Sequence, residues 1–133
     1  MMASASRRLM LTAFLLAPFS FSVASAQHTD EQGQIDTQIQ NTWMRFLEEV
    51  RANDAQSAAE YFTPRVRKQY LEAFQSSGDQ LHKIADGWSK IKAVSLSTPF
   101  AEYTLFDDEG DGQRMFLITF VKSADGSWMI HSM

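Results

Sequence analysis

An acidic segment, Asp107 to Gly112, carries the residue types that could bind calcium. Its sequence is Asp-Asp-Glu-Gly-Asp-Gly, and oxygen ligands at alternate positions followed by glycine are typical of an EF-hand loop. The twelfth position of such a loop should be a bidentate glutamate, but Ile118 stands there, and the flanking residues alternate as strands do. We therefore predict a solvated acidic hairpin tip, and the residues that could contact a cationic protein there are Asp107, Asp108, Glu109 and Asp111.

Histidine could supply acid–base chemistry near neutral pH. His131 lies in the last predicted strand, but a general base needs an orienting acceptor or a bound substrate, and the sequence shows no paired carboxylate. His28 falls in a polar N-terminal segment and His82 on a short predicted helix, where a surface position is the simpler explanation. The three histidines are too scattered to indicate a zinc site.

The chain has no cysteine, which excludes lipoprotein acylation, disulfides, thiolate metal sites and a cysteine nucleophile. Nucleophile triads, phosphate-binding glycine loops and internal repeats are also missing from the sequence. We therefore assign no catalytic, cofactor-binding or metal-binding residue from motifs, and we expect no cofactor.

Residues 1–26 have the pattern of an export signal. Arg7 and Arg8 precede an apolar run from Leu9 to Phe21, and Ala24-Ser25-Ala26 ahead of Gln27 is typical of a signal-peptidase site. The run is short for a membrane span, although a retained anchor stays an alternative. We predict cleavage near Ala26-Gln27 and a periplasmic or secreted protein.

The export route and the charge of the processed chain follow from the same leader. Ser6 to Leu11 loosely fits a twin-arginine signal, but no cofactor motif requires folding before export, so the general secretory route is favoured.

The leader carries two of the 12 basic residues and none of the 16 acidic ones, so the remainder is more acidic than the formal net charge of −4. Nucleic acid and anionic membranes are thus unexpected partners, and a basic protein is favoured.

We expect a flexible tail over residues 27–34 and a single domain over residues 35–133. Apolar residues recur every three to four positions from Ile35 to Val50, which predicts a helix that ends near Asn53-Asp54. A short helix then carries Ala58, Ala59 and Phe62. A third helix begins at Thr63-Pro64 and ends at Gly78, and a last helical segment runs from Asp79 to Gly87.

After Trp88 the apolar period changes to two, which is typical of strands. The predicted strands include Val94 to Leu96, Ala101 to Phe106, Met115 to Val121 and Trp128 to Met133, with a hairpin turn at Asp125-Gly126. Helices followed by a meander of about four antiparallel strands predict an α+β domain, with the N-terminal helices packed on one face of a curved sheet.

Several of these features occur in the order found in a known superfamily. They are a long helix with Trp43 and Phe46, its end at Arg51-Ala52-Asn53-Asp54, the segment Ala58-Ala59-Glu60-Tyr61-Phe62, and a strand Phe116 to Lys122 that turns at Asp125-Gly126 into Trp128-Met129-Ile130. This order resembles the nuclear transport factor 2-like superfamily, a cystatin-like cone in which a curved sheet wraps around helices. The likeness covers most of Ile35 to Met133.

The resemblance implies a cone cavity but no single chemistry, because the superfamily includes isomerases, cyclases, dehydratases and members without catalysis. Its isomerase-like members use acidic and tyrosine groups inside the cone, and the candidates here are Asp86, Glu102, Tyr61, Tyr70, Tyr103 and His82. No motif matches position by position, so no catalytic residue is carried over. Side chains that could line a pocket are Trp43, Tyr61, Tyr70, Trp88, Tyr103 and His131.

We predict an exported domain that binds without catalysis, with a protein as the favoured partner, in a role like that of an immunity protein or an envelope accessory factor. A homodimer through the sheet face is a further option. The alternative is a small apolar ligand in the cone, either carried or turned over by a ketosteroid-isomerase-like or polyketide-cyclase-like enzyme. A cone filled by side chains would exclude the alternative, whereas an open pocket with Asp86 or Glu102 beside a tyrosine would favour it.

Overall fold

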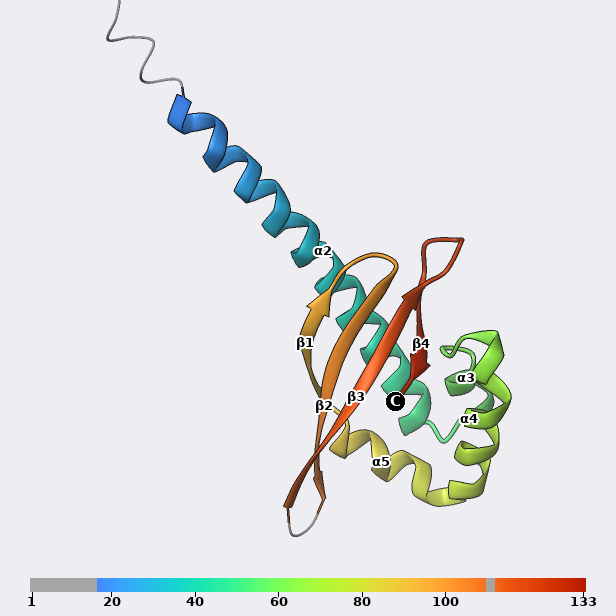
Figure 1. Cartoon of the computed structure of the whole chain (residues 1–133). Coiled ribbons are helices and arrows are strands. Elements are labelled where there is room, and N and C mark those ends of the chain that lie inside the picture. The colour runs from blue at the N-terminus through green and yellow to red at the C-terminus, as the bar shows by residue number, and fades with distance from the viewer. Residues whose placement is uncertain (1–16, 110–111) are drawn as a thin grey trace, which may run out of the picture. The chain divides into compact units, whose positions relative to one another are not determined.

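The structure is a computed structural model that describes residues 17–109 and 112–133 (Figure 1). The chain divides into two compact units, Met1–Gln34 and Ile35–Met133, and the second unit contains the layered fold. Most of the predicted leader, residues 1–16, lies outside the described residues, so cleavage and export stay predictions. Within the described part of the chain, no helix combines the length and the apolar character that a membrane span requires.

The first described helix, α2, spans Ala17–Arg51. It begins well before Ile35, where we predicted the first helix to start, and residues 30–34 of the predicted flexible tail are helical. Among the α2 side chains whose burial is described, residues 30–51, the first buried one is Ile39. The apolar period reports the part of a helix that packs, and it gives no signal for polar, exposed turns that extend the same helix.

Three further helices follow as predicted: α3 (Ala55–Ala59), α4 (Pro64–Ser77) and α5 (Leu81–Gly87), with a short 3-10 turn, η1 (Gly78–Gln80), between the last two. The predicted end of α2 is confirmed, because Asn53 has a φ of 56° and the Asp54 carboxylate accepts a hydrogen bond from the Ser57 amide at 3.1 Å. The Asn53 side chain also accepts a hydrogen bond from the His82 amide at 2.8 Å, which ties the start of α5 to this corner.

The four strands are β1 (Lys90–Leu96), β2 (Phe100–Glu109), β3 (Gly112–Lys122) and β4 (Trp128–Ser132). They form one antiparallel sheet in the order β1-β2-β3-β4, which confirms the predicted α+β fold and meander. The β2–β3 hairpin is longer than expected. Asp107 pairs with Arg114 and Glu109 with Gly112, so most of the predicted acidic loop belongs to the two strands.

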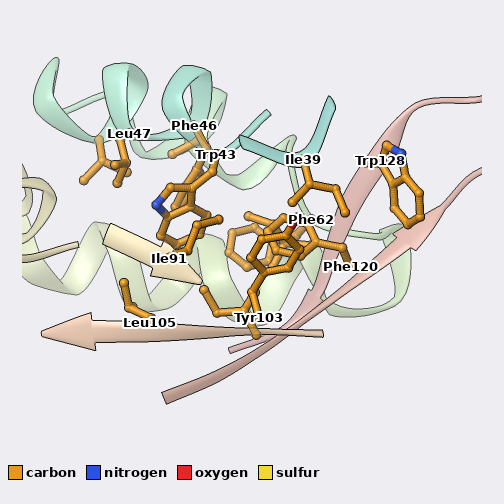
Figure 2. Packing of buried hydrophobic residues seen from close by; sticks show 14 of the residues in the cluster. Ile39, Trp43, Phe46, Leu47, Phe62, Ile91, Tyr103, Leu105, Phe120 and Trp128 are labelled. Atoms are coloured by element: carbon orange, nitrogen blue, oxygen red, sulfur yellow. The ribbon is translucent and has the colours of Figure 1, made fainter. Parts of the chain in front are cut away.

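One face of the sheet packs against the helices and forms the core. Figure 2 shows Trp43 and Phe46 of α2 beside the inner-face residues of the strands. The Trp43 indole donates a hydrogen bond to the Trp88 carbonyl at 2.8 Å, which satisfies its polar atom inside the apolar layer. The core includes Ile39, Trp43, Phe46, Leu47, Val50, Phe62, Ile91, Ala101, Tyr103, Leu105, Ile118, Phe120, Trp128 and Ile130.

The opposite face of the sheet leaves large apolar side chains accessible. Met115 is 68% exposed and Leu117 54% exposed on β3, and Phe100 on the neighbouring strand is exposed as well. The register pairs Phe106 with Met115 and Phe100 with Val121, so these residues share one surface. We call the surface formed by Phe100, Phe106, Met115, Leu117 and Val121 the open sheet face.

The two edges of the sheet differ. The connector before α4 pairs with β4, since the Thr63 amide donates to the Ile130 carbonyl at 2.9 Å and the Ile130 amide donates to the Tyr61 carbonyl at 2.8 Å. The β1 edge carries Lys90 and Lys92, and its register shifts between Ala93 and Ser95. One edge is thus partly paired and the other is charged and irregular.

Candidate functional site

A cavity of about 290 Å³ lies between the helical layer and one end of the sheet. Its walls come from α4, α5, β2 and β3 together with two residues outside these elements. They are Tyr70, Ala73, Phe74, Ser77, Ile84, Trp88, Leu105, Asp107, Phe116 and Met133. The space between the helices and this end of the sheet is therefore not completely filled by side chains.

The α4 wall is held in place by a ring stack and by a pair of hydrogen bonds. The Tyr70 ring stacks on Phe62 with centroids 4.1 Å apart. The Tyr70 hydroxyl donates to the Met133 carbonyl at 3.2 Å and accepts from the Met133 amide at 3.1 Å. Its only proton is therefore used by the backbone, and the ring presents an apolar surface to the cavity.

A second part of the wall includes Trp88, directly after α5. Its ring lies 6.4 Å from that of Trp43, between centroids, and its carbonyl accepts the Trp43 hydrogen bond. Ile84 of α5 and Leu105 of β2 extend this wall. The buried α2 residue Trp43 thus positions a cavity residue without reaching the cavity itself.

Asp107 is the one charged residue among the described residues of the lining. It is 6% exposed and shares the inner face of β2 with Ala101, Tyr103 and Leu105, because side chains at alternate positions point the same way. Its Oδ1 atom makes no hydrogen bond to any residue that the structure describes. A β-carbon on Gly87 would lie 2.6 Å from that oxygen, so the carboxylate occupies the space that a side chain at position 87 would need.

Two of the six predicted pocket residues, Tyr70 and Trp88, line this cavity. Trp43 and Tyr103 are instead fully buried in the core. Tyr61 is half-buried with its ring against Phe46, at 6.0 Å between centroids. The His131 Nδ1 atom lies 3.2 Å from the Thr63 hydroxyl, near the connector that pairs with β4.

The acid–base candidates do not meet in the cavity. Asp86 is exposed and lines a separate hollow with Lys83 and Lys90, and Glu102 is exposed on β2. The Tyr103 hydroxyl donates to the Asp36 carboxylate at 2.6 Å. Burial, and then this hydrogen bond, raise the pKa of Tyr103, so its phenol is held in the neutral form.

The prediction for Asp107 was wrong, because it is buried beside the cavity and not part of a solvated tip. The side chains of Asp108 and Glu109, and Asp111 as a whole, lie outside the described residues, so their contact with a partner stays a prediction. The alternation from Ala101 to Leu105 places position 107 on the inner face and could have identified this carboxylate. Its acidic neighbours obscured that signal.

Among the side chains that the structure describes, no group of three or more histidine, aspartate or glutamate residues is arranged to hold a metal ion. A scan of the sequence against protein-family models finds no match, and a search of curated proteins finds no significant one. The resemblance to the nuclear transport factor 2-like superfamily therefore stays a prediction.

Proposed function

We propose that this chain is an exported binding protein that holds a small apolar molecule in the cavity between α4, α5 and the sheet, without catalysis. The observation that carries the proposal is the cavity itself, whose lining is mostly apolar and whose polar groups are two hydroxyls bonded to the backbone and one carboxylate. Its volume of about 290 Å³ is about twice the roughly 150 Å³ that accommodates benzene in a dry apolar cavity. A molecule with one substituted ring therefore fits.

The hydrogen bonds of the lining support binding in preference to proton transfer. General acid–base catalysis needs a proton-transfer group within hydrogen-bond reach of the reacting atom. The Tyr70 hydroxyl is engaged by the Met133 backbone, and the Ser77 hydroxyl donates to the Ala73 carbonyl at 3.2 Å. Asp107 is thus the one charged group of the described lining that can contact a ligand, and no second unengaged acid or base stands beside it there to complete a proton transfer.

Filling the cavity should remove ligand binding. In Ser77→Leu, the new side chain occupies the cavity and displaces the uncharged probe p-xylene. Each methylene that the probe can no longer bury costs about 0.8 kcal/mol of binding free energy, so its affinity should fall by about tenfold or more. Amide NMR shifts of the full-length chain, followed during titration with p-xylene, measure the dissociation constant.

The matched control is Ser76→Leu. Ser76 is the preceding residue of α4, is exposed, and makes the same kind of hydrogen bond, from its hydroxyl to the Glu72 carbonyl at 2.9 Å. We expect this variant to bind p-xylene as the unchanged protein does. Absence of saturable shifts at Phe74, Leu105 and Phe116 in the unchanged protein would contradict the proposal.

The open sheet face supports a second candidate function, the formation of a homodimer. Met115 and Leu117 are more than half exposed at neighbouring outer positions of β3. Lys92 and Glu102 lie on outer positions of β1 and β2 beside them. A two-fold interface must be complementary to itself, and an apolar patch flanked by charges of both signs meets that condition, so this surface is suited to a second copy of the chain.

The double variant Met115→Lys with Leu117→Lys should shift a dimer to monomer, since it buries two new like charges per copy. Sedimentation velocity of the full-length chain measures the change. Met44→Lys provides a control, because Met44 is comparably exposed but lies on α2. A chain that sediments as a monomer at every concentration would rule out this candidate.

A further inference from the structure

We propose that the ligand of this cavity carries a protonated amine on an apolar body, and that the carboxylate of Asp107 binds this amine. The inference rests on the proposed function, because it names the class of molecule that the cavity selects. It begins from Asp107, which alone among the described side chains is both charged and buried.

A buried carboxylate oxygen without a donor is unfavourable for a folded protein. Oδ1 of Asp107 is in this state with respect to the residues that the structure describes. Such groups persist in native proteins where a bound partner or a function explains them. A ligand that donates a hydrogen bond to this carboxylate would supply the missing donor. A donor that also carries a positive charge would stabilise the carboxylate most.

The local backbone is compatible with a carboxylate at this position. Gly87 has no side chain, and a β-carbon there would be 2.6 Å from Oδ1 and 3.6 Å from Cγ of Asp107. The close approach of α5 to β2 thus requires glycine if the carboxylate keeps its place. Rotation about the Cβ–Cγ bond can turn either oxygen toward the cavity, because this torsion is broad.

The other polar groups of the lining are already occupied. The hydroxyls of Tyr70 and Ser77 both donate to backbone carbonyls. The remaining walls include Phe74, Ile84, Trp88, Leu105 and Phe116, which contribute apolar surface. A ligand in this cavity therefore meets one charged acceptor in an apolar site, which favours an apolar ammonium and disfavours a carboxylate of the same shape.

Arg114 lies opposite Asp107 in the β2–β3 register and is exposed. It could neutralise the same carboxylate from within the chain. Neutralisation by a ligand amine and neutralisation by Arg114 predict different binding preferences. If Arg114 neutralised the carboxylate of Asp107, an amine would have no advantage over a neutral ligand.

The test compares three probes that share one ring and differ in the head group: 2-phenylethylamine, 2-phenylethanol and phenylacetate. Each is titrated at neutral pH into the full-length chain, and amide NMR shifts give the site and the dissociation constant. We expect the amine to bind about tenfold more tightly than the alcohol, with phenylacetate weakest. In Asp107→Asn, the amine should lose this tenfold advantage while the alcohol changes by less than about twofold.

Two further variants separate contact from general charge effects. Asp86→Asn removes an equal charge from an exposed residue next to Gly87 and should leave the amine preference unchanged. Gly87→Ala displaces the Asp107 carboxylate and should weaken amine binding several-fold with little effect on the alcohol.

Equal affinity for amine and alcohol in the unchanged protein would overturn the inference but leave the proposed function intact. An equal loss of amine binding in Asp86→Asn and Asp107→Asn would also overturn it. Failure of all three probes, together with failure of p-xylene, would overturn the proposed function as well.

Discussion

Trp43→Ala should lower the free energy of unfolding by about 3–5 kcal/mol, the range for removing a large aromatic side chain from a packed core. Trp43 is fully buried, and its ring contacts Phe46 and Phe120 with centroids 5.0 and 6.3 Å away. The substitution also leaves the Trp88 carbonyl without its 2.8 Å indole donor. Urea unfolding followed by circular dichroism measures the loss.

Met44→Ala is the matched control for this prediction. Met44 is the next residue of α2 and is 61% exposed, so its truncation should change the free energy of unfolding by less than about 0.5 kcal/mol. Because Trp43 positions Trp88, we also expect Trp43→Ala to weaken binding in the cavity. A loss below about 1 kcal/mol in Trp43→Ala would mean that the layer between α2 and the sheet is not packed as described.

Stability should fall steeply above about pH 10, the pKa of an exposed tyrosine in an unfolded chain. Burial raises the pKa of Tyr103 in the native state, so its contribution is fully present below pH 10. As the pH rises, the unfolded state releases the phenol proton while the native state keeps it. The free energy of unfolding should therefore drop by about 1.4 kcal/mol per pH unit for this group.

Tyr103→Phe separates this contribution from the others. Burial, followed by the charge of Glu49, also raises the pKa of Tyr61. More than one tyrosine therefore makes the free energy of unfolding of the unchanged protein depend on pH in the alkaline range. At pH 8 the variant should be about 1–2 kcal/mol less stable, because it lacks the hydrogen bond to Asp36. That difference should shrink above pH 10, and a difference independent of pH would refute the assignment to Tyr103.

Most helices and strands of the fold could be predicted from the spacing of apolar residues in the sequence. The apolar stripe of α2, the Asn53-Asp54 stop and the alternation in β2 each depend on neighbours a few residues apart, so they are readable without tertiary information. The helical state of residues 30–34 was missed because these exposed polar residues carry no apolar period. The length of the β2–β3 hairpin was missed for a related reason, since acidic residues are depleted in strands on average.

The site was less accessible to sequence reasoning. Tyr70 and Trp88 were chosen as large rings that could face a cavity, but nothing local separates them from Trp43 and Tyr103, which are of the same types and lie in the core. The place of Asp107 depends on how far β2 continues, and its proximity to Gly87 depends on where α5 crosses the sheet. Both the place of Asp107 and its proximity to Gly87 depend on tertiary structure, which local sequence patterns do not report.

The pairing of the Tyr61–Thr63 connector with β4 has a consequence for the behaviour of the protein in concentrated solution. An exposed strand edge is a template on which further chains can add and grow into fibrils. Here the connector occupies backbone groups at Ile130, and on the far side Lys90, Lys92 and the irregular register near Val94 oppose a flat incoming strand. The sheet can therefore display apolar side chains on its open face while its two edge strands resist polymerisation.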